Sequence, residues 1–277
     1  DLPILLNYFP SVVTTSDAGA GVGYTGFRVR GTGNRGINVT INGIPYNDAE
    51  SLGTFFVNLQ DFSSSIESVQ LQRGVGTSTN GAGAFGASLN ILTDAATPEA
   101  YAEVNASGGS FDTRRANVKF GTGLINDHFS FSGRLSAIKS DGYVDRASSD
   151  LKSYYLQGEY RNEKTLLKAV VFGGHEVTYQ SWNGIDAQTL ATDRTYNPIG
   201  FQYDDDGNFQ GFYEDQVDNY KQDHVQLHWN QKYGGGWSTQ LSLNYTMGRG
   251  FFEEYVDSWY YANVNFSSDA TFDFIGW

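Results

Sequence analysis

The stretch FRVRGTGNRGINVTINGIPYND, residues 27–48, contains three glycines at the G-x-G-x-x-G spacing: Gly31, Gly33 and Gly36. In a dinucleotide-binding protein these glycines follow a strand and open a helix, whose N-terminus holds the pyrophosphate. Here the next residues, INVTIN, alternate with a period of two, and Asn42-Gly43 then signals a tight turn. The glycines therefore join strand to strand, and nucleotide binding is not predicted.

Two other patterns resemble metal sites without completing them. His224 and His228 are four residues apart, but they lie in the alternating segment HVQLHWN, where a strand separates them by roughly 13 Å. We expect both to face a barrel lumen or solvent. The segment QYDDDGNFQGFYED matches a calcium loop at its third, fifth and sixth positions and fails at the first and twelfth, so at most a loosely held cation fits there.

Catalytic motifs are missing from the sequence. There is no G-x-S-x-G, H-E-x-x-H or P-loop motif, and no cysteine for a thiolate site or a disulfide. We therefore predict no enzyme, no cofactor and no resident metal. The net charge of −13 argues against nucleic acid as a partner, because phosphate binding needs a basic surface.

The composition favours β-structure in a membrane. Aromatic residues make up 15% of the chain, charged residues only 18%, and there are 33 glycines and 5 prolines. The mean hydropathy is nevertheless −0.41, and no apolar run is long enough for a transmembrane helix. A β-barrel wall alternates apolar and polar residues and so looks hydrophilic on average. The start, DLPILLNYFP, lacks the features of a signal peptide, so we expect a mature or trimmed segment.

The chain divides into two regions near residue 97. Residues 1–97 are rich in glycine, with short predicted strands at Leu2–Leu6, Phe27–Arg30, Ile37–Ile41, Ile66–Gln72 and Ser88–Leu92. Residues 98–277 contain about seven long alternating runs. In HFSFSGRLSA, for example, Phe129, Phe131 and Leu135 oppose Ser130, Arg134 and Ser136.

The connections between these runs also alternate, with short turns at TGLIND, RNEK and KYGGGW and long polar segments between the others. This asymmetry is typical of outer-membrane barrels and favours one over a soluble sandwich with one wet face. Aromatic residues near the strand ends form a possible interfacial girdle: Tyr101, Phe120, Tyr160, Trp229 and Tyr245. Seven strands are too few to enclose a domain of this size, so we expect the N-terminal portion of a larger protein.

The first region resembles the plug of TonB-dependent outer-membrane transporters. The resemblance rests on the Arg-Gly segment with its following strand, turn and G-[IV]-P, and on IESVQLQRGVGTSTNGAGAFGASLNILT, with Ala87 where the family usually has Gly. The long segment HEVTYQSWNGID…RTYNPIG looks like Bacteroidetes-type relatives. The resemblance implies a mainly β protein, with a plug of mixed α+β inside a large antiparallel transmembrane barrel (22-stranded in the family), of which about seven strands are present here.

The resemblance also implies roles for individual residues. Arg30 and Arg73 would sit inside the barrel and pair with wall carboxylates, and Glu67 would join the same polar network. A buried arginine needs such a partner because an unpaired desolvated charge is costly. The glycines of the second motif would serve turns and close approach to the wall: Gly74, Gly81, Gly83 and Gly86. Polar and aromatic groups that could meet substrate are Tyr24, Arg35, Tyr46, Asn47, Asp48, Glu50, Tyr179 and Trp182.

The implied function is energised import of a scarce nutrient across the bacterial outer membrane. By family frequency the first expectation is an iron-siderophore or haem, with cobalamin, oligosaccharide or peptide as alternatives, and a non-transporting adhesion barrel as a different class. The implied partners are TonB with its inner-membrane energising complex, outer-membrane lipid and the small nutrient, and a surface lipoprotein is a further expected partner.

Overall fold

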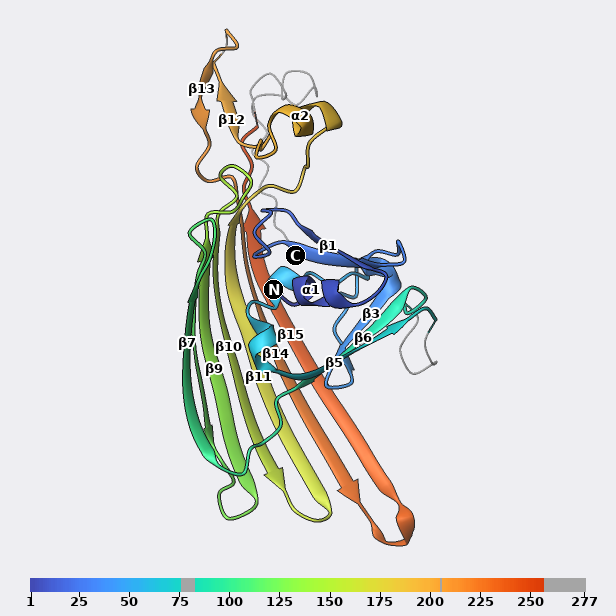
Figure 1. Ribbon diagram of the computed structural model, residues 1–277. Coiled ribbons are helices and arrows are strands. Elements are labelled where there is room, and N and C mark those ends of the chain that lie inside the picture. The colour runs from blue at the N-terminus through green and yellow to red at the C-terminus, as the bar shows by residue number, and fades with distance from the viewer. Residues whose placement is uncertain (76–82, 205, 257–277) are drawn as a thin grey trace, which may run out of the picture.

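The computed structural model describes residues 1–75, 83–204 and 206–256, which form two units packed face to face (Figure 1). Gly81 and the last part of the predicted barrel region, residues 257–277, lie outside the described residues. Within the described ranges, no helix is long and apolar enough to cross a membrane.

The larger unit is a seven-stranded antiparallel sheet, called the wall below. Its strands follow the chain in order, each pairing with the next. They are β7 (Ala100–Gly108), β8 (Arg114–Thr122), β9 (Phe129–Ser140), β10 (Ser149–Arg161), β11 (Thr165–Tyr179), β14 (Val217–Lys232) and β15 (Ser238–Phe252). The predicted seven strands are confirmed, and most are longer than the alternating runs suggested. Even the shortest, with 9 residues, reaches the roughly 9–11 residues of a tilted bilayer-spanning strand.

The wall strands are joined by short turns at one end and mostly by longer segments at the other. The short turns are at the bottom of Figure 1, and the largest connection is at the top. That connection carries α2 (Ala187–Thr192) and the hairpin of β12 (Phe201–Tyr203) and β13 (Phe209–Phe212). The acidic stretch considered as a calcium loop is the turn of this hairpin. The Asp204 carboxylate accepts hydrogen bonds from the backbone N–H groups of Asp206 and Asn208, at 3.1 and 2.8 Å.

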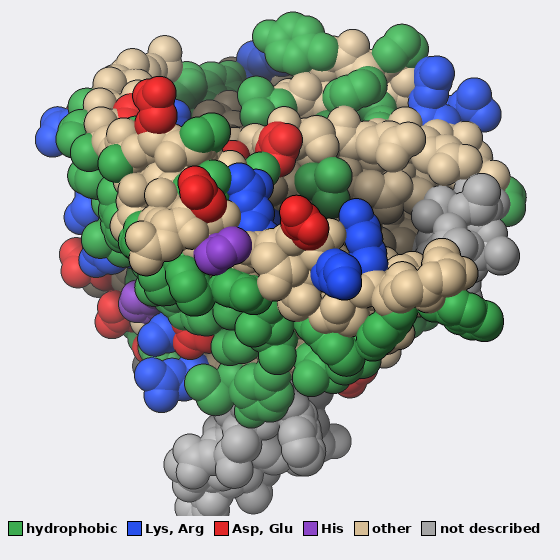
Figure 2. All heavy atoms as spheres, turned by 90° about the horizontal axis from the view of Figure 1, so that it is seen from below, with side chains coloured by type: hydrophobic (Ala, Val, Ile, Leu, Met, Phe, Trp, Pro, Cys, Tyr) green, Lys and Arg blue, Asp and Glu red, His purple; other side chains and the backbone are tan. Residues whose placement is uncertain are grey.

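The two faces of the wall have opposite polarity. Large apolar side chains on the outer face are open to the surroundings, among them Val104, Phe131 and Leu135. Polar side chains on the inner face are buried, among them Arg134, Ser136, Gln157, Glu176, Gln226 and His228. Seen from the short-turn end, Figure 2 shows apolar side chains gathered along the outer rim and polar groups toward the middle. This inside-out arrangement suits a sheet whose outer face meets lipid.

The smaller unit, formed by the predicted plug region, lies against the inner face of the wall (Figure 1). A two-stranded sheet pairs β1 (Val12–Ser16) with β2 (Thr25–Val29). A four-stranded sheet has the order β4-β3-β6-β5, with β3 and β6 parallel. Its strands are β3 (Ile37–Ile41), β4 (Ile44–Pro45), β5 (Ile66–Arg73) and β6 (Ala87–Thr93). The last plug strand ends at Thr93 and the first wall strand begins at Ala100; the domain division at residue 97 stays a prediction.

The prediction of a strand at Leu2–Leu6 is wrong. These residues form α1 (Leu2–Leu5) and the start of a 3₁₀ turn, Leu6–Tyr8. Pro3 is placed in the first helical turn, where its missing N–H costs nothing. The adjacent residues Leu2 and Pro3 are both buried, whereas successive side chains of a strand would point to opposite sides.

The opening glycine motif joins strand to strand, as predicted, through a 3₁₀ turn at Asn34–Gly36. The tight turn at Asn42-Gly43 is also confirmed. Both residues have positive φ, 55° and 80°, and they connect β3 to β4 with Ile41 opposite Ile44. This is the geometry for which Asn-Gly is preferred in two-residue hairpins.

Gly86 serves a close approach, but to another plug segment rather than to the wall. Its N–H donates to the carbonyl of Gly36 at 2.8 Å. A Cβ at Gly86 would lie 2.4 Å from Cγ2 of Thr32, so a larger residue would push the two segments apart. The expectation that it approaches the wall is therefore corrected.

Two hydrophobic clusters connect the two units; the smaller joins Val22 and Val57 of the plug to Ile138 and Leu151 of the wall. The other is larger. Strands β3 and β6 contribute Ile41 and Leu89, and the wall contributes Tyr155, Val170 and Phe172, all buried in the same cluster. The ring of Phe62 packs on that of Phe172 with centroids 5.0 Å apart. The plug is thus held against the wall by apolar packing as well as by the polar contacts described next.

Candidate functional site

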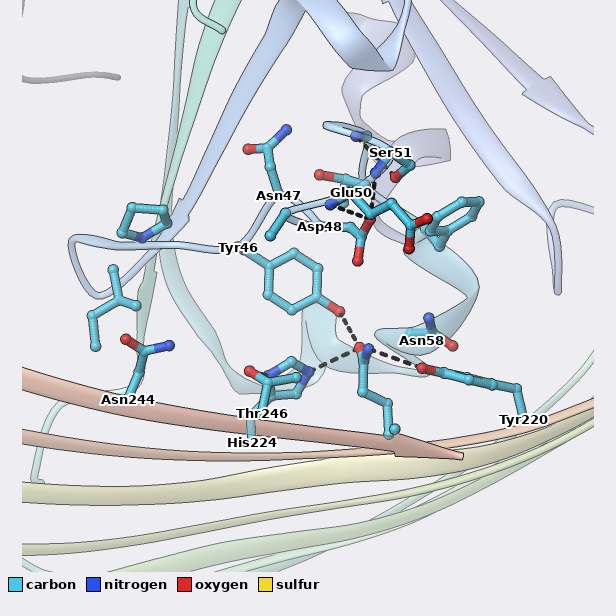
Figure 3. Close-up of a pocket in the computed structure, with 18 of the residues that line it drawn as sticks. Tyr46, Asn47, Asp48, Glu50, Ser51, Asn58, Tyr220, His224, Asn244 and Thr246 are labelled. Atoms are coloured by element: carbon cyan, nitrogen blue, oxygen red, sulfur yellow. Dashed lines mark hydrogen bonds between the residues drawn. The ribbon is translucent and has the colours of Figure 1, made fainter. Parts of the chain in front are cut away.

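A cavity of about 760 Å³ lies where the plug meets β14 and β15. Plug residues 44–55 line one side, and the other side includes the half of β14 that is nearer the long connections. Figure 3 shows Tyr46, Asp48 and Glu50 on the plug side, across from Tyr220 and His224 on the wall side. The cavity is therefore on the long-loop side of the plug, and of the predicted substrate contacts it takes in Tyr24, Tyr46, Asn47, Asp48 and Glu50.

Two side chains of the plug segment that lines this cavity form hydrogen bonds with backbone groups of nearby plug residues. Asn47 accepts from the N–H of Val39 at 2.7 Å and donates to the carbonyls of Ile37 and Leu52 at 2.9 and 3.0 Å. Asp48 accepts from the N–H groups of Glu50 and Ser51 at 3.1 and 2.7 Å. The hydrogen bonds from Ser51 and Glu50 hold the pKa of Asp48 below its ordinary value, although burial acts in the opposite direction. Asn47 is thus used to fix the loop.

Tyr46 connects this loop to the wall. Its hydroxyl donates to Oε1 of Gln222 at 3.3 Å, and the same oxygen lies 3.0 Å from Nε2 of His224 (Figure 3). The rings of Tyr46 and His224 are in contact, with centroids 5.1 Å apart. Burial raises the pKa of Tyr46, so its hydroxyl stays protonated as a donor. The prediction that His224 faces the lumen is confirmed, and the ring is packed against the plug.

Tyr24 of the plug contacts both the wall strand β14 and the long outer loop that follows β11. Its hydroxyl donates to the Asp218 carboxylate at the start of β14, and its ring meets that of Trp182 edge to face at 5.6 Å. Burial, together with the negative charges of Glu176 and Asp218, raises the pKa of Tyr24. The predicted contacts Tyr24 and Trp182, far apart in sequence, therefore lie side by side, and of the two Tyr24 lines the cavity.

The charge of the cavity is one-sided. Four acidic residues line it: Asp48, Glu50, Glu176 and Asp218. No lysine or arginine is among the described lining residues. Glu176 is 1% exposed, and its Oε2 atom has no hydrogen-bond partner within the described chain.

A second polar cluster, called the Asp61 cluster below, fixes the plug to the wall away from the cavity. Asp61 of the plug pairs with Arg115 at 2.7 Å and with Arg134 at 3.4 Å, and it accepts from Asn117 at 3.0 Å. Burial raises the pKa of Asp61, but the bonds from Ser136, Arg115 and Asn117 and the charge of Arg134 outweigh it and hold the pKa below its ordinary value.

The remaining bonds of the cluster satisfy the buried arginine. Arg134, 1% exposed, donates through Nε to Ser65 at 2.8 Å and through Nη1 to Ser153 at 3.1 Å. Sequence reasoning missed this cluster, because it assigned the arginines to the plug and the carboxylates to the wall. The available signal was the position of Arg134 among serines on the polar face of an alternating run, which places it in the lumen.

The predicted plug arginines lie elsewhere. Arg30 follows β2 and Arg73 ends β5; both are exposed, and neither pairs with a carboxylate of the described residues. The Nη1 atom of Arg73 donates to the carbonyl of Pro10 at 3.1 Å. Glu67 is exposed and lines a separate cavity of about 700 Å³ that includes the short turn at residues 162–165. The ion-pairing roles of these three residues stay predictions.

Three predicted substrate contacts do not line the first cavity: Arg35, Tyr179 and Trp182, the last of which contacts the lining residue Tyr24. Arg35 is exposed in the 3₁₀ turn before β3. Tyr179 is used within the outer loop, where its hydroxyl donates to the carbonyl of Tyr213 at 3.0 Å and its ring lies 5.9 Å from the guanidinium carbon of Arg146. Whether any of the three contacts substrate stays a prediction.

Comparison with known proteins now gives the family. Residues 1–88 match the family model described as TonB-dependent Receptor Plug Domain. Among solved structures, the chain is similar to the ferripyoverdine receptor of the outer membrane of Pseudomonas aeruginosa, at 16% identity and a TM-score of 0.62, covering 88% of this chain and 31% of that one. It is also similar to the ferric citrate transporter FecA, at 16% identity and a TM-score of 0.66, covering 91% of this chain and 38% of that one. A third similar structure is the copper transporter OprC, at 12% identity and a TM-score of 0.65, covering 90% of this chain and 35% of that one.

Residues 1–88 are therefore a TonB-dependent receptor plug domain, and the plug with its wall has the fold of the corresponding part of these receptors. The wall is a section of a transmembrane β-barrel, and the protein belongs in the bacterial outer membrane. The chain spans about a third of the length of the solved structures it matches. The Bacteroidetes-type origin stays a prediction.

Proposed function

We propose that the complete receptor imports a scarce nutrient across the outer membrane, and that it is not an enzyme. The observation that carries this proposal is the cavity of about 760 Å³ on the long-loop side of a plug that packs against the barrel wall. A ligand held there has the plug beneath it, so its release inward requires the plug to move. TonB, with its inner-membrane complex, is the proposed source of energy for that movement.

An iron chelate, such as a ferric siderophore, or haem is the first candidate for the nutrient. Of the three similar structures described above, two are named for ferripyoverdine and ferric citrate, and the third is named for copper. Cobalamin, oligosaccharide and peptide are the alternatives. A surface lipoprotein that covers the long loops is a further proposed partner. A barrel that only binds or adheres is less well supported, because such a barrel has no use for a movable lumen domain.

A reversible cross-link between plug and wall tests the import proposal. The chain has no cysteine, so an introduced pair is unambiguous. A Cβ placed on Gly23 of the plug lies 3.7 Å from Cβ of Ser149 on β10, within the range for a disulfide. The double variant Gly23→Cys/Ser149→Cys should be made in the complete receptor in its native host, with each single variant as a control.

The measurement is whole-cell accumulation of ⁵⁵Fe supplied as hydroxamate, catecholate or carboxylate chelates, or as haem, compared with a strain that lacks the receptor. Oxidised cells with the double variant should bind the active chelate at the surface and not accumulate it, and a reductant should restore accumulation. Accumulation that is unaffected by the closed cross-link would refute plug movement through this interface. Accumulation of none of the probes by the wild type would refute iron as the cargo.

A further inference from the structure

We propose that the cavity beside Tyr46 recognises a ligand that carries an organic cation, such as an ammonium or guanidinium group, and that Glu176 is the residue that pairs with it. This deepens the proposed function, on which it rests, by naming the chemical class of the imported ligand.

The first support is the state of Glu176. Its side chain lines the cavity from β11, is 1% exposed, and leaves Oε2 without a hydrogen-bond partner among the described residues. A carboxyl group removed from water without a partner is held in its neutral form, and a cation with N–H donors would stabilise the charged form and supply the missing hydrogen bond. The residue is therefore set up to gain energy from a ligand.

The second support is the charge around Glu176. Asp218, Asp48 and Glu50 also line the cavity, and no described lysine or arginine does. With Glu176 the four acidic residues come from three segments: Glu176 from β11, Asp218 from the start of β14, and Asp48 and Glu50 from the loop after β4. Their summed field attracts a cation and repels a polycarboxylate chelate.

The third support is the aromatic lining. Tyr24, Tyr46 and Tyr220 line the cavity, as do Phe55 and Tyr245. Tyr46 donates to Oε1 of Gln222, and Nε2 of the same amide lies 3.5 Å from the hydroxyl of Tyr220. Aromatic faces bind ammonium and guanidinium groups favourably, the more so when water is excluded. Carboxylates together with aromatic rings recognise an organic cation better than they recognise a neutral sugar or an anion.

The test measures binding rather than transport, so that its failure is distinguishable from failure of the import proposal. Purified complete receptor in nanodiscs is titrated with three fluorescent probes of similar size. They are dansylcadaverine, which carries one ammonium group; its N-acetyl derivative, which is neutral; and dansyl-aminohexanoate, which carries a carboxylate. The wild type should bind the ammonium probe at least about tenfold more tightly than the neutral one, and the carboxylate probe most weakly.

Glu176→Gln should reduce the preference for the ammonium probe about tenfold and leave the neutral probe unaffected. The matched control is Glu159→Gln, which changes a carboxylate of β10 that lines the other cavity, and it should leave the preference unchanged. Equal affinity for the three probes in the wild type overturns the proposal, and so does the absence of binding at millimolar probe. If a basic residue of another part of the receptor paired with Glu176, the wild type would show no preference for the ammonium probe, and the proposal would be overturned. An unchanged preference in Glu176→Gln overturns the assignment to this residue.

Discussion

The two polar regions where the plug meets the wall are built in opposite ways. In the Asp61 cluster one plug carboxylate faces two wall guanidinium groups, and serine side chains accept hydrogen bonds from both arginines. The Nε atom of Arg115 has no partner among the described residues. In the cavity several carboxylates face one another across open space, and Glu176 has an atom without a partner. In the first region each charged side chain has an opposite charge beside it without a ligand, which suits attachment of the plug. The second is incomplete without one and suits recognition.

The largest expected effect is the loss of the Asp61 charge. Asp61→Asn keeps the shape of the side chain and leaves Arg134 buried without a counter-charge. We expect the plug to be destabilised by about 3–5 kcal/mol, the cost of breaking a buried pair by removing one partner. Urea-induced release of the plug from the complete receptor, followed by limited proteolysis, measures this effect.

Glu176→Gln is the matched control for Asp61→Asn, because it also removes a buried carboxyl group, but one that has no described cation beside it. Plug stability should be unchanged or slightly higher in this variant. Equal destabilisation by the two variants would show that the cavity also holds the plug, and the distinction between attachment and recognition would be lost.

A smaller effect is expected on the outer face of the wall. Leu135 lies near the middle of β9 and is 57% exposed, whereas its neighbour Ser136 is buried against Asp61. Leu135→Arg should destabilise the folded barrel by about 2–4 kcal/mol, as expected for a charge on the lipid face near the bilayer midplane. Urea unfolding in phospholipid vesicles measures the change, with Leu135→Ala as the size control. An arginine that is tolerated as well as alanine would mean that this face does not contact lipid.

The β3–β4 turn should give an effect of about 1–2 kcal/mol, because Gly43 has a φ of 80°, where a Cβ is unfavourable. Gly43→Ala should lower plug stability by that amount in the urea release assay. Gly184 in the outer loop has a similar φ of 66° and provides the control. If Gly184→Ala destabilises the plug equally, the turn has no special part in seating it.

The smallest effect at ordinary pH concerns proton binding. The pKa of Asp61 is held below its ordinary value, so the docked plug favours the charged form. Its contribution is therefore fully present above the unfolded value of about 3.9 and is lost as the pH falls through the lower folded value. Plug release should be constant from about pH 8 to pH 5 and increase below about pH 4. In Asp61→Asn this acid-dependent part should disappear; its persistence would assign it to other carboxylates.

The strands of the wall are the part of the fold that the sequence pattern predicts best. The alternation of Phe129, Phe131 and Leu135 with Ser130, Arg134 and Ser136 predicted both the strand and the opposite polarity of its faces, because side chains on a strand point alternately to its two sides. The Asn42-Gly43 turn was equally local, since few residue pairs accept positive φ at both positions. The motif at Leu2–Leu6 was misassigned because a five-residue apolar run fits a helix as well as a strand.

The site depended on the tertiary structure. No local pattern indicates that Asp61 meets Arg134, 73 positions later, or that Tyr24 meets Asp218 and Trp182. Sequence reasoning expected plug arginines with wall carboxylates, whereas the described ion pairs place the carboxylate in the plug. Pairing across the interface depends on how the plug is seated, and the seating is decided by the shared core of Ile41, Leu89 and Phe172. The alternation of residues specifies which faces of the strands are polar, whereas the packing of the plug against the wall specifies which polar groups meet.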